Sequence, residues 1–469
     1  MRVVMKFGGS SLKNGLLIRR VAEIVRGYLG KGFEEVVVCS AMDKLTDILL
    51  DMIEKASKGN EDRVEEILDL IHRMHHGAVR EAIKDESLRE EILGSIKKEF
   101  EELKRAVYGV LYLREATPRS RDYIISFGER FSTRIFYGAL RDLGVKSEYL
   151  DGKSAGIITD SNFGEANPLL EVTRFEVRRR IKPLLDGGIT PVVTGFMGVN
   201  EEGVYTTLGR GGSDYTATIL GYCLDVDEIW LWSDVDGLMT ADPRIVKDAR
   251  VLSRVSYAEA VEMAMFGAKG LHPRALEPAM NAKIPVRIRN TFNPTACGTL
   301  ISSKSGHTET VVKCVLLVQD VGMITVKGVS MVGRPGTAAR IFSILAESGI
   351  NIMMISQSVS ESGISMIVRR SQLQKAVNCL EDNLLGGFVK EVEAEDDVNV
   401  VAIVGEGMKG TPGVASKVFG AVARRGINIR MIAQGSSELN ISFVVKEEDG
   451  VEAVKAIHEE YGLSLIGEP

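Results

Sequence analysis

Several signals of membrane, secreted and nucleic-acid-binding proteins are missing from this sequence of 469 residues. No apolar run approaches the roughly 20 residues that a membrane-spanning helix needs, and the N-terminus lacks the apolar core of a signal peptide. Cysteine is scarce, with five residues and no CxxC spacing, which argues against a disulfide framework or a structural zinc site. Basic charge is not in excess, because the formal net charge is −6, so neither nucleic acid nor an anionic membrane is an expected partner. We therefore predict a cytoplasmic protein.

Two familiar cofactor signals are absent or weak. No G-x-x-x-x-G-K-[ST] motif occurs, which excludes a P-loop nucleotide site. Gly405–Gly410 (GEGMKG) fits the G-x-G-x-x-G pattern of dinucleotide-binding turns, but it lies inside an internal repeat whose other copy lacks the pattern. His72, His75 and His76 have a helical spacing that could hold a metal, but they sit in a charged helical stretch without an HExxH partner. We therefore expect neither dinucleotide binding nor a protein metal site, and we expect these histidines on a solvated helix face.

Glycine, in contrast, is abundant, with 48 residues, about a tenth of the chain against a typical ~7%. In the first part of the chain, glycines and other small residues end apolar β-rich runs such as 2–9 and 34–42. Repeated strand-then-helix order with nearly continuous apolar strands predicts a parallel sheet covered on both faces. Residues 46–113 differ, because Glu, Lys, Arg, Leu and Ile recur there at three-to-four spacing, which predicts amphipathic helices.

The strongest organisational feature is a repeat that follows a polar linker at residues 301–310. The segments that begin at Met323 and Val400 align without a gap at an offset of 77 residues, so that Pro335 matches Pro412. Each copy has the pattern of a strand, a glycine loop, a helix, two strands and a second helix. A βαββαβ order predicts a ferredoxin-like unit with an antiparallel sheet and two helices on one face.

Three glycine clusters follow apolar strands, where ligands bind in open α/β sheets. Lys6–Ser11 (KFGGSS) offers a lysine and a turn whose backbone N–H groups can approach phosphate oxygens, although a plain turn with a surface lysine fits equally well. Thr207–Asp214 (TLGRGGSD) presents an arginine between glycines, suited to a carboxylate or phosphate, and makes Ser213 and Asp214 N-cap candidates of the next helix. Trp232–Gly237 (WSDVDG) suits hydrogen bonding to a nucleotide, but also an ordinary Asp-Gly turn.

Together these motifs resemble the aspartate kinases of the amino-acid kinase superfamily along essentially the whole chain. The motifs that carry the resemblance are KFGGSS, VVVCSAM, SFGER, VVTGFMG, TTLGRGGSDYTA, WSDVDGLMTADPR and FGAKGLHP, in this order. In the last motif, His272 is expected to be a structural residue before proline rather than a base. The two C-terminal repeats resemble ACT regulatory domains.

The resemblance implies an α/β fold, with a three-layer α/β/α sandwich around a mainly parallel sheet and two ferredoxin-like βαββαβ ACT domains behind it. It also implies the domain boundaries. We expect the kinase domain at 1–303 with a helical subregion at about 46–120, a linker and shared strand at 304–320, and ACT domains at 321–394 and 395–469. The strand around 311–318 is expected to complete the second ACT unit, so that the first is inserted into it.

The resemblance further implies that ATP, carried as its Mg²⁺ complex, phosphorylates the side-chain carboxylate of L-aspartate to 4-phospho-L-aspartate, the first step of lysine, threonine and methionine biosynthesis. A carboxylate acceptor is already ionised at pH 7 and needs cationic compensation rather than an activated nucleophile. By resemblance, the catalytic residues are Lys6, Asp214 and Lys269. The substrate-binding residues are Ser40, Thr46, Glu129, Phe196, Arg210 and Ser213, with Arg210 for the α-carboxylate and Glu129 for the α-ammonium group. The nucleotide-binding residues are Lys6, Gly8, Gly9, Ser10, Ser233, Asp234, Met239, Arg244 and Lys269.

ACT domains bind small amino acids, usually between paired domains, so the resemblance implies an effector and a homodimer or tetramer. The candidate effector residues are Met331, Gly336, Asn351, Ile352 and Gln357 in the first copy and Asn428 and Gln434 in the second. We expect the second copy to be mainly structural. Threonine and lysine are the expected inhibitors, and threonine is favoured because SQSVSE and AQGSSE offer hydroxyl and amide groups without an acidic pair for a lysine ammonium.

Two other functions stay open. A non-catalytic amino-acid sensor could keep the ACT pair on a kinase scaffold, but it should then have lost Lys6, Arg210 or Asp234, and all three are present. A related kinase that acts on acetylglutamate, glutamate or UMP is the nearer alternative, and the ACT pair together with Glu129 argues against it. A fused homoserine dehydrogenase is not expected, since the chain ends just after the second repeat.

Overall fold

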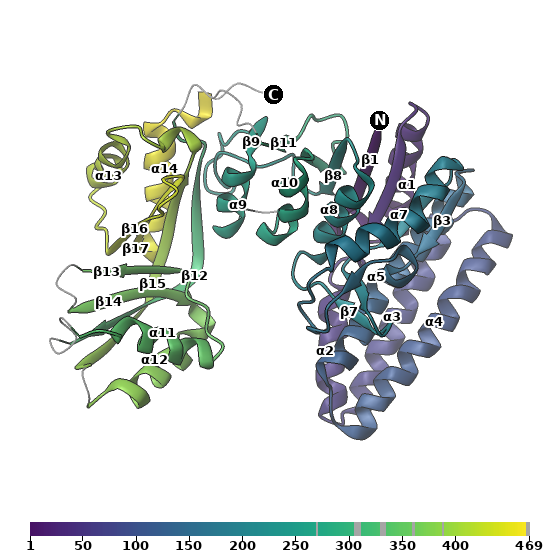
Figure 1. The fold of residues 1–469 in the computed structure, drawn as a ribbon, viewed down its shortest axis with the longest axis horizontal. Helices are drawn as coiled ribbons and strands as arrows, with labels where there is room; N and C mark the ends of the chain where they lie inside the picture. The colour runs from purple at the N-terminus through teal and green to yellow at the C-terminus, as the bar shows by residue number, and fades with distance from the viewer. Residues whose placement is uncertain (269–270, 304–310, 329–333, 359–361, 387–388, 466–469) are drawn as a thin grey trace. The chain divides into compact units, whose positions relative to one another are not determined.

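A computed structural model describes residues 1–268, 271–303, 311–328, 334–358, 362–386 and 389–465. The chain divides into two compact units, which are described separately below. The N-terminal unit comprises Met1–Leu238, Ser253–Tyr257 and Lys269–Lys304, and the C-terminal unit comprises Met239–Leu252, Ala258–Ala268 and Ser305–Pro469. Figure 1 labels the helices and strands along the chain.

An eight-stranded sheet forms the centre of the N-terminal unit, in the order β3-β5-β2-β1-β8-β10-β11-β9. Neighbouring strands are parallel except for β10 and β11. The strands are β1 (Arg2–Phe7), β2 (Glu34–Cys39), β3 (Ser147–Leu150), β5 (Thr190–Thr194), β8 (Glu228–Ser233), β9 (Arg254–Ser256), β10 (Val286–Asn290) and β11 (Thr299–Ser302). A second, small sheet contains β4 (Ile158–Thr159), β6 (Met197–Asn200) and β7 (Tyr205–Thr207).

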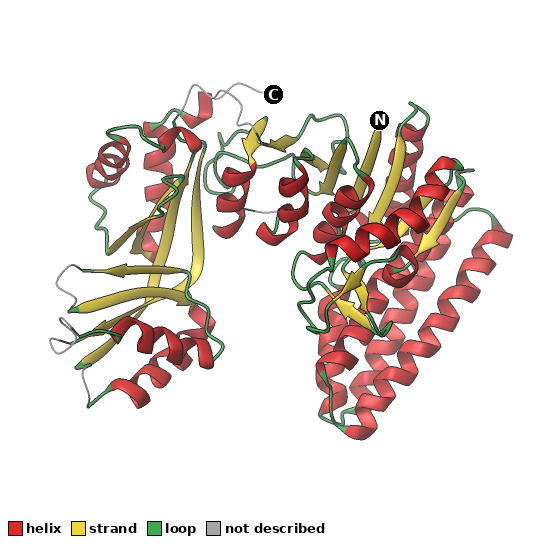
Figure 2. Cartoon of the chain, viewed as in Figure 1, coloured by secondary structure: helices red, strands yellow, loops and turns green. Residues whose placement is uncertain are grey.

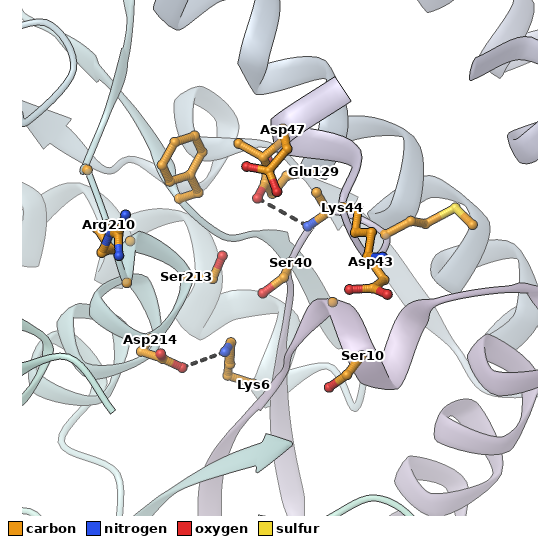
Figure 3. A pocket seen from close by; sticks show the side chains of 18 residues that line it. Lys6, Ser10, Ser40, Asp43, Lys44, Asp47, Glu129, Arg210, Ser213 and Asp214 are labelled. Carbon is orange, nitrogen blue, oxygen red and sulfur yellow. Dashed lines mark hydrogen bonds and ion pairs between the residues drawn. The ribbon is translucent and has the colours of Figure 1, made fainter. Parts of the chain in front are cut away.

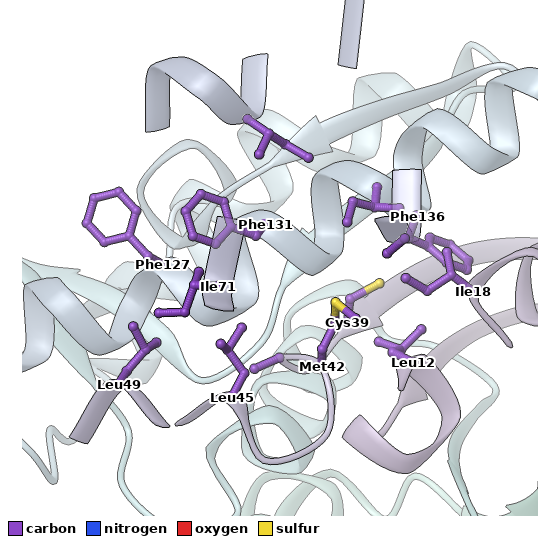
Figure 4. Close-up of a cluster of buried hydrophobic side chains, with 14 of the residues drawn as sticks. Leu12, Ile18, Cys39, Met42, Leu45, Leu49, Ile71, Phe127, Phe131 and Phe136 are labelled. Atoms are coloured by element: carbon purple, nitrogen blue, oxygen red, sulfur yellow. The ribbon is translucent and has the colours of Figure 1, made fainter. Parts of the chain in front are cut away.

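Helices cover both faces of the large sheet, and Figure 2 shows them in red around the yellow strands. One face is covered by α1 (Gly15–Leu29), α2 (Leu45–Ser57), α3 (Glu61–Ala82), α4 (Glu86–Leu113) and α5 (Pro118–Asp142). Val3, Met5 and Phe7 of β1 are fully buried in a cluster with these helices, part of which Figure 4 draws. Side chains alternate between the faces of a strand, so Lys6 points to the other face. The remaining helices of this unit are α6 (Gly152–Ala155), α7 (Leu170–Asp186), α8 (Gly212–Leu224) and α10 (Glu277–Ala282).

Local sequence explains where the long helices begin. The N-cap residues of α3, α4 and α5 are Asn60, Asp85 and Thr117, and each side chain accepts a hydrogen bond from a backbone N–H three residues further on. Such caps satisfy donors that the first helical turn leaves unpaired. Residues 46–113, predicted to be amphipathic helices, accordingly contain α2, α3 and α4.

The expectation of a solvated histidine face on α3 is wrong for His75. This ring is 1% exposed, lies 4.8 Å from the Phe131 ring between centroids, and its Nδ1 is 2.7 Å from the Ile71 carbonyl oxygen. His72 is exposed, and its ring stacks on His76. The three-to-four spacing therefore placed one histidine on the buried stripe of an amphipathic helix. No group of three metal-ligating side chains forms among the described residues.

A six-stranded antiparallel sheet forms the centre of the C-terminal unit, in the order β13-β14-β12-β15-β17-β16. The strands are β12 (Cys314–Lys327), β13 (Met354–Gln357), β14 (Gly363–Arg369), β15 (Glu391–Val404), β16 (Met431–Gln434) and β17 (Asn440–Lys446). The first part of β12 pairs with the end of β15, and its second part pairs with β14. One continuous strand thus serves both repeats. The predicted fold class, a mainly parallel α/β unit followed by ferredoxin-like repeats, is confirmed.

Each repeat places two helices on one face of its half of the sheet. These are α11 (Thr337–Glu347) and α12 (Arg370–Leu384) in the first, and α13 (Val414–Arg424) and α14 (Gly450–Glu460) in the second. Gly336 and Gly413 are the N-cap residues of α11 and α13, with φ of 87° and 85°. The repeated glycines therefore occupy equivalent left-handed positions. The helix α9 (Tyr257–Met265) also lies mainly in this unit.

Two of the three glycines of the GEGMKG segment, Gly405 and Gly407, have a packing role. A Cβ atom on Gly405 would lie 2.5 Å from the Val311 carbonyl oxygen, and one on Gly407 would lie 3.0 Å from Val311 Cα. They therefore allow the chain that enters β12 to pass close by.

Across the described residues, no helix combines the length and the apolar character needed to cross a membrane.

Candidate active site

A cavity of about 510 Å³ opens beside the carboxyl ends of β1 and β2 (Figure 3). Among its lining residues are ten that the sequence analysis assigned to the site: Lys6, Gly9, Ser10, Ser40, Thr46, Glu129, Phe196, Arg210, Ser213 and Asp214. The other lining residues were given no individual role by sequence reasoning. Ala41, Met42, Gly209, Gly211 and Gly212 belong to motifs it quoted, whereas Asp43, Lys44 and Asp47 do not. The cavity thus gathers residues from five separate stretches of the chain.

Lys6 and Asp214 form a buried ion pair at the base of this cavity. The Lys6 Nζ atom lies 2.5 Å from an Asp214 carboxylate oxygen, and both residues are 9% exposed. Lys6 points away from the aromatic core because it alternates with Phe7 along β1, and Asp214 meets it from the first turn of α8. The pair leaves an oriented ammonium group at the end of a parallel strand, where an anionic ligand can reach it.

The turns after β1 and β2 approach each other closely. The Gly8 N–H donates to the Trp232 carbonyl oxygen at 3.1 Å, and the Ser40 N–H donates to the Phe7 carbonyl oxygen at 3.1 Å. A Cβ atom on Gly9 would lie 3.1 Å from the Ala41 carbonyl oxygen, tighter than ordinary van der Waals contact. Glycine at position 9 therefore lets the two strand ends share one cavity.

Glu129 is the most deeply buried carboxylate of the cavity. It comes from the middle of α5, is 3% exposed, and one of its oxygens accepts the Ala41 N–H at 3.1 Å. The other oxygen has no hydrogen-bond partner among the described residues. Burial raises the pKa of Glu129 to about 8, although the Ala41 hydrogen bond and the charge of Lys6 oppose the shift. The site therefore holds a carboxyl group that a bound cation would help to ionise.

Arg210 lies between two glycines in left-handed conformations, Gly209 with φ of 76° and Gly211 with φ of 73°. It is exposed, and the described residues offer it no ion-pair partner. The predicted capping role of Ser213 and Asp214 is wrong, because the N-cap of α8 is Gly211 and no side chain caps the helix. Asp214 is committed to Lys6 instead, and backbone N–H groups at the start of α8 remain suited to an anion.

Two lining residues, Lys44 and Phe196, have strained backbones. Their φ angles are 62° and 70°, which lie in a backbone region that residues other than glycine rarely adopt. Phe196 is held there because its N–H donates to Thr216 Oγ1 at 3.0 Å and its carbonyl oxygen accepts the Leu208 N–H at 2.8 Å. Such strain persists where the surroundings enforce it, and it clusters at functional sites. Nothing in the local sequence distinguishes Lys44, so this signal exists only in the structure.

The expected nucleotide residues fall in different parts of the chain. Ser233 ends β8, next to the end of β1, and the exposed Asp234 follows it. Neither lines the cavity described above. Met239 and Arg244 belong to the C-terminal unit, where the Arg244 guanidinium pairs with Asp242 at 2.6 Å. Gly8 lies in the turn after β1, and Lys269 lies outside the described residues.

The expected effector residues are placed in the C-terminal unit. Gln357 ends β13 and lines a second cavity of about 460 Å³, together with Thr325, Lys327, Gly328, Ser356, Ser358, Ser362, Gly363, Ser365, Lys390 and Glu391. Gly336, Asn351 and Ile352 do not line it. Gln434 ends β16 at the equivalent position of the second repeat, and Asn428 precedes that strand. Met331 lies outside the described residues.

Comparisons with known proteins agree with both units. The model of the amino acid kinase family matches residues 1–290, and that of the ACT domain matches residues 324–384 and 401–461. The chain is 36% identical to aspartokinase 1, chloroplastic, of Arabidopsis thaliana, over 98% of this chain and 80% of that protein. It is 33% identical to the bifunctional aspartokinase/homoserine dehydrogenase 1, chloroplastic, of Zea mays, of which it spans 50%.

Solved structures give the same result. Escherichia coli aspartokinase III in complex with lysine and aspartate matches with a TM-score of 0.82 and 30% identity, over 98% of this chain and 99% of that one. The same enzyme in complex with aspartate and ADP matches equally well. The family resemblance drawn from the motifs is thereby confirmed, and the chain belongs to the aspartokinases of the amino acid kinase family.

Proposed function

We propose that this protein transfers the γ-phosphoryl group of MgATP to the side-chain carboxylate of L-aspartate, producing 4-phospho-L-aspartate and ADP. This reaction opens the biosynthesis of lysine, threonine and methionine. The observation that carries the proposal is the gathering of Lys6, Glu129 and Arg210 around one cavity in a chain of the aspartokinase family. An amino-acid dicarboxylate carries two anionic groups and one cationic group, and this cavity offers a complement to each.

Arg210 and Glu129 would hold the backbone end of aspartate. A guanidinium that is free of ion pairs suits bidentate binding of the α-carboxylate, and Arg210 lines the cavity with no ion-pair partner among the described residues. The buried Glu129 would receive the α-ammonium group, which would donate to the carboxylate oxygen that has no hydrogen-bond partner among the described residues. Ser40, Thr46 and Ser213 add hydroxyl groups to the lining, and Phe196 adds an aromatic wall.

Lys6 would act on the transferred phosphoryl group. The acceptor carboxylate is ionised at neutral pH, so the main barrier is repulsion between two anions, which a positioned cation reduces. Asp214 keeps the Lys6 ammonium in place through their ion pair. The backbone of Gly9 and Ser10 would contribute N–H groups beside the phosphates, and Gly8, whose own N–H donates to Trp232, would let the phosphates approach this turn. The nucleotide would be bound by Ser233, Asp234, Met239, Arg244 and Lys269.

The test is the identity of the phosphoryl acceptor. ADP release is measured with L-aspartate, L-glutamate, N-acetylglutamate and UMP, and the acyl phosphate is trapped with hydroxylamine as a hydroxamate. We expect ADP release and hydroxamate with aspartate above the other acceptors. A preference for another acceptor, or no acceptor-dependent ADP release, would overturn the proposal and favour a related kinase or a sensor.

Arg210→Ala separates the two substrates. Losing hydrogen bonds to a charged group costs about 3 kcal/mol, so the KM for aspartate should rise roughly 100-fold, while the KM for ATP stays near its original value. Arg210→Lys is the matched control, because it keeps the charge but loses the planar fork, and it should recover only part of the binding. If the KM for ATP rises instead, the two subsites have been exchanged.

We propose further that the C-terminal repeats, at 321–394 and 395–469, bind an amino-acid inhibitor of a catalytic domain at 1–303. Support comes from the cavity around Gln357, whose lining is rich in hydroxyl groups and includes two lysines and Glu391. Hydroxyl groups favour threonine, and Lys327 or Lys390 would meet its carboxylate, whereas lysine would need Glu391 for its side chain. Melting curves with threonine, lysine and methionine decide between these effectors, and the absence of a shift in melting temperature with threonine counts against threonine as the inhibitor.

We also propose that the protein is a homodimer or tetramer. Light scattering in the absence and presence of these amino acids tests this oligomeric state.

A further inference from the structure

Asp122 is a buried carboxylate that lies outside the cavity yet fastens the segment that carries Arg210. It sits in the first turns of α5, is 1% exposed, and is not among the lining residues. One carboxylate oxygen accepts the N–H groups of Gly164 at 2.9 Å and Thr207 at 2.8 Å. The other oxygen accepts the Thr207 hydroxyl at 2.8 Å. Asp122 therefore joins α5, a loop and a strand end with three hydrogen bonds.

Thr207 is the last residue of β7, and only Leu208 and Gly209 separate it from Arg210. Its carbonyl oxygen accepts the Ala166 N–H at 2.9 Å, so both sides of Thr207 are held. The loop is held in turn by Arg274, whose guanidinium donates to the Ala166 carbonyl oxygen at 2.9 Å. The end of β7 is therefore a fixed point from which the arginine segment begins.

The same loop also passes close to Gly209. A Cβ atom on Gly209 would lie 3.2 Å from the Gly164 carbonyl oxygen and 3.2 Å from Glu165 Cγ. Because the Gly164 N–H is bound to Asp122, the position of this loop under Gly209 depends on the same carboxylate. On the other side of Arg210, the Gly212 N–H donates to the Gly209 carbonyl oxygen at 2.9 Å. A turn with two left-handed glycines has little rigidity of its own, so its direction is set by these supports.

We propose that Asp122 is a positioning residue for the amino-acid subsite: it sets the direction of Arg210 and thereby the affinity for the substrate α-carboxylate, without touching the substrate. This inference rests on the proposed function, which assigns Arg210 to that carboxylate. A misplacement of about 1 Å is enough to cost roughly 100-fold in a positioned site. The effect should appear in the KM for aspartate, because the Asp122 hydrogen bonds go only to Gly164 and Thr207 and reach none of the residues assigned to the nucleotide.

The experiment uses Asp122→Asn in the full-length protein. The amide has one acceptor oxygen, which can face either the two N–H groups or the Thr207 hydroxyl, and its NH2 group then faces the other side. In both orientations the hydrogen bonds are no longer made to a carboxylate, which weakens them. We expect the KM for aspartate to rise about 10- to 100-fold, with kcat at saturating aspartate and the KM for ATP within about twofold of the original values. Thr207→Val, which removes only the hydroxyl bond, should give a smaller rise, and Thr207→Ser should restore the original value. This pair keeps the test available if Asp122→Asn does not fold.

Asp160→Asn is the matched control. Asp160 belongs to the same loop and also accepts three hydrogen bonds, from Asn162 N–H at 3.1 Å and from the backbone and side-chain amides of Asn167 at 2.9 and 2.7 Å. These bonds stay within the loop and do not reach Thr207, so the KM for aspartate should stay within about twofold. An equal rise in this variant would mean that any loosening of the loop matters, and would overturn the role of Asp122.

A double-mutant cycle separates positioning from general damage. In an Arg210→Ala background, Asp122→Asn should have no further effect on the KM for aspartate, because the group it positions is gone. The inference would be overturned if the effects of the two substitutions on the KM for aspartate multiply. It would also be overturned if the KM values for aspartate and for ATP change in parallel. Wild-type protein without aspartate-dependent ADP release would instead overturn the proposed function, and this inference with it.

Discussion

The raised pKa of Glu129 predicts a defined pH dependence of aspartate binding. The carboxyl group is 3% exposed and has one N–H donor, and burial raises its pKa to about 8. At pH 7 roughly one molecule in ten of the free enzyme then carries an ionised Glu129. If only this form accepts the α-ammonium group, kcat/KM for aspartate should rise about tenfold per pH unit below pH 8 and level off above it.

The sign of the effect follows from the linkage between protons and substrate. A carboxyl group with a raised pKa is protonated in the free site, and the incoming ammonium favours the ionised form. Aspartate binding at pH 7 should therefore release about 0.9 of a proton. Initial rates at saturating MgATP give the pH profile, and calorimetry in buffers of different ionisation enthalpy gives the proton count.

Glu129→Gln should remove both the slope of kcat/KM and the proton release. Glu102→Gln is the control, because this half-buried carboxylate of α4 pairs with Arg130 at 3.1 Å and lies outside the cavity, so it should keep the profile. A flat kcat/KM profile between about pH 6 and 8 in the wild type, or a slope that survives in Glu129→Gln, would refute the reasoning.

Three further predictions concern catalysis and stability. Lys6→Ala should lower kcat by about 100-fold or more with an unchanged circular dichroism spectrum, and near-normal turnover would remove Lys6 from the mechanism. Burial raises the pKa of Glu35 from 4.5 to about 9, so the stability associated with its protonated form is complete below pH 4.5 and is lost as the pH rises toward 9. The free energy of unfolding of the wild type, measured with urea, should therefore fall relative to that of Glu35→Gln by about 1.4 kcal/mol per pH unit in that window. Parallel curves of unfolding free energy against pH for the two proteins would contradict this. Lys313 and Glu259 form an ion pair at 2.7 Å, and their side chains are 2% and 0% exposed. Lys313→Met should therefore lower the free energy of unfolding by about 3–5 kcal/mol, whereas Lys327→Met, at the exposed pair with Glu393, should lower it by about 1 kcal/mol or less. Equal losses in the two variants would show that burial does not decide the effect.

Much of the fold was predictable because it depends on local patterns. Apolar runs that end in glycine, such as the one before Gly8, predicted parallel strands, and the aligned copies from Met323 and Val400 predicted two similar antiparallel units. The site was predictable where it follows strand ends, as with Lys6 and Arg210. Glu129 came from family resemblance alone, because a glutamate in mid-helix has no local signal of its own.

Other features required the packed structure. Hydrophobic periodicity could not tell which histidine of α3 faces inward, and burial of His75 depends on Phe131 of another helix. Local capping rules assigned Ser213 and Asp214 to the start of α8, but Asp214 is bound instead by Lys6, a residue far away in the chain. Asp122 and Lys44 were not noticed, since their roles depend on a loop and on a backbone conformation.

The sequence by itself determined the order of elements, the strand-end turns and the repeat, because these follow from the spacing of apolar residues and from the freedom of glycine. Only the tertiary structure decided which charges meet, which carboxyl group is buried enough for a pKa near 8, and how the segment with Arg210 is held. The physical reason is that partners such as Lys6 and Asp214, or Asp122 and Thr207, lie far apart in the chain, and their contact depends on how whole layers pack.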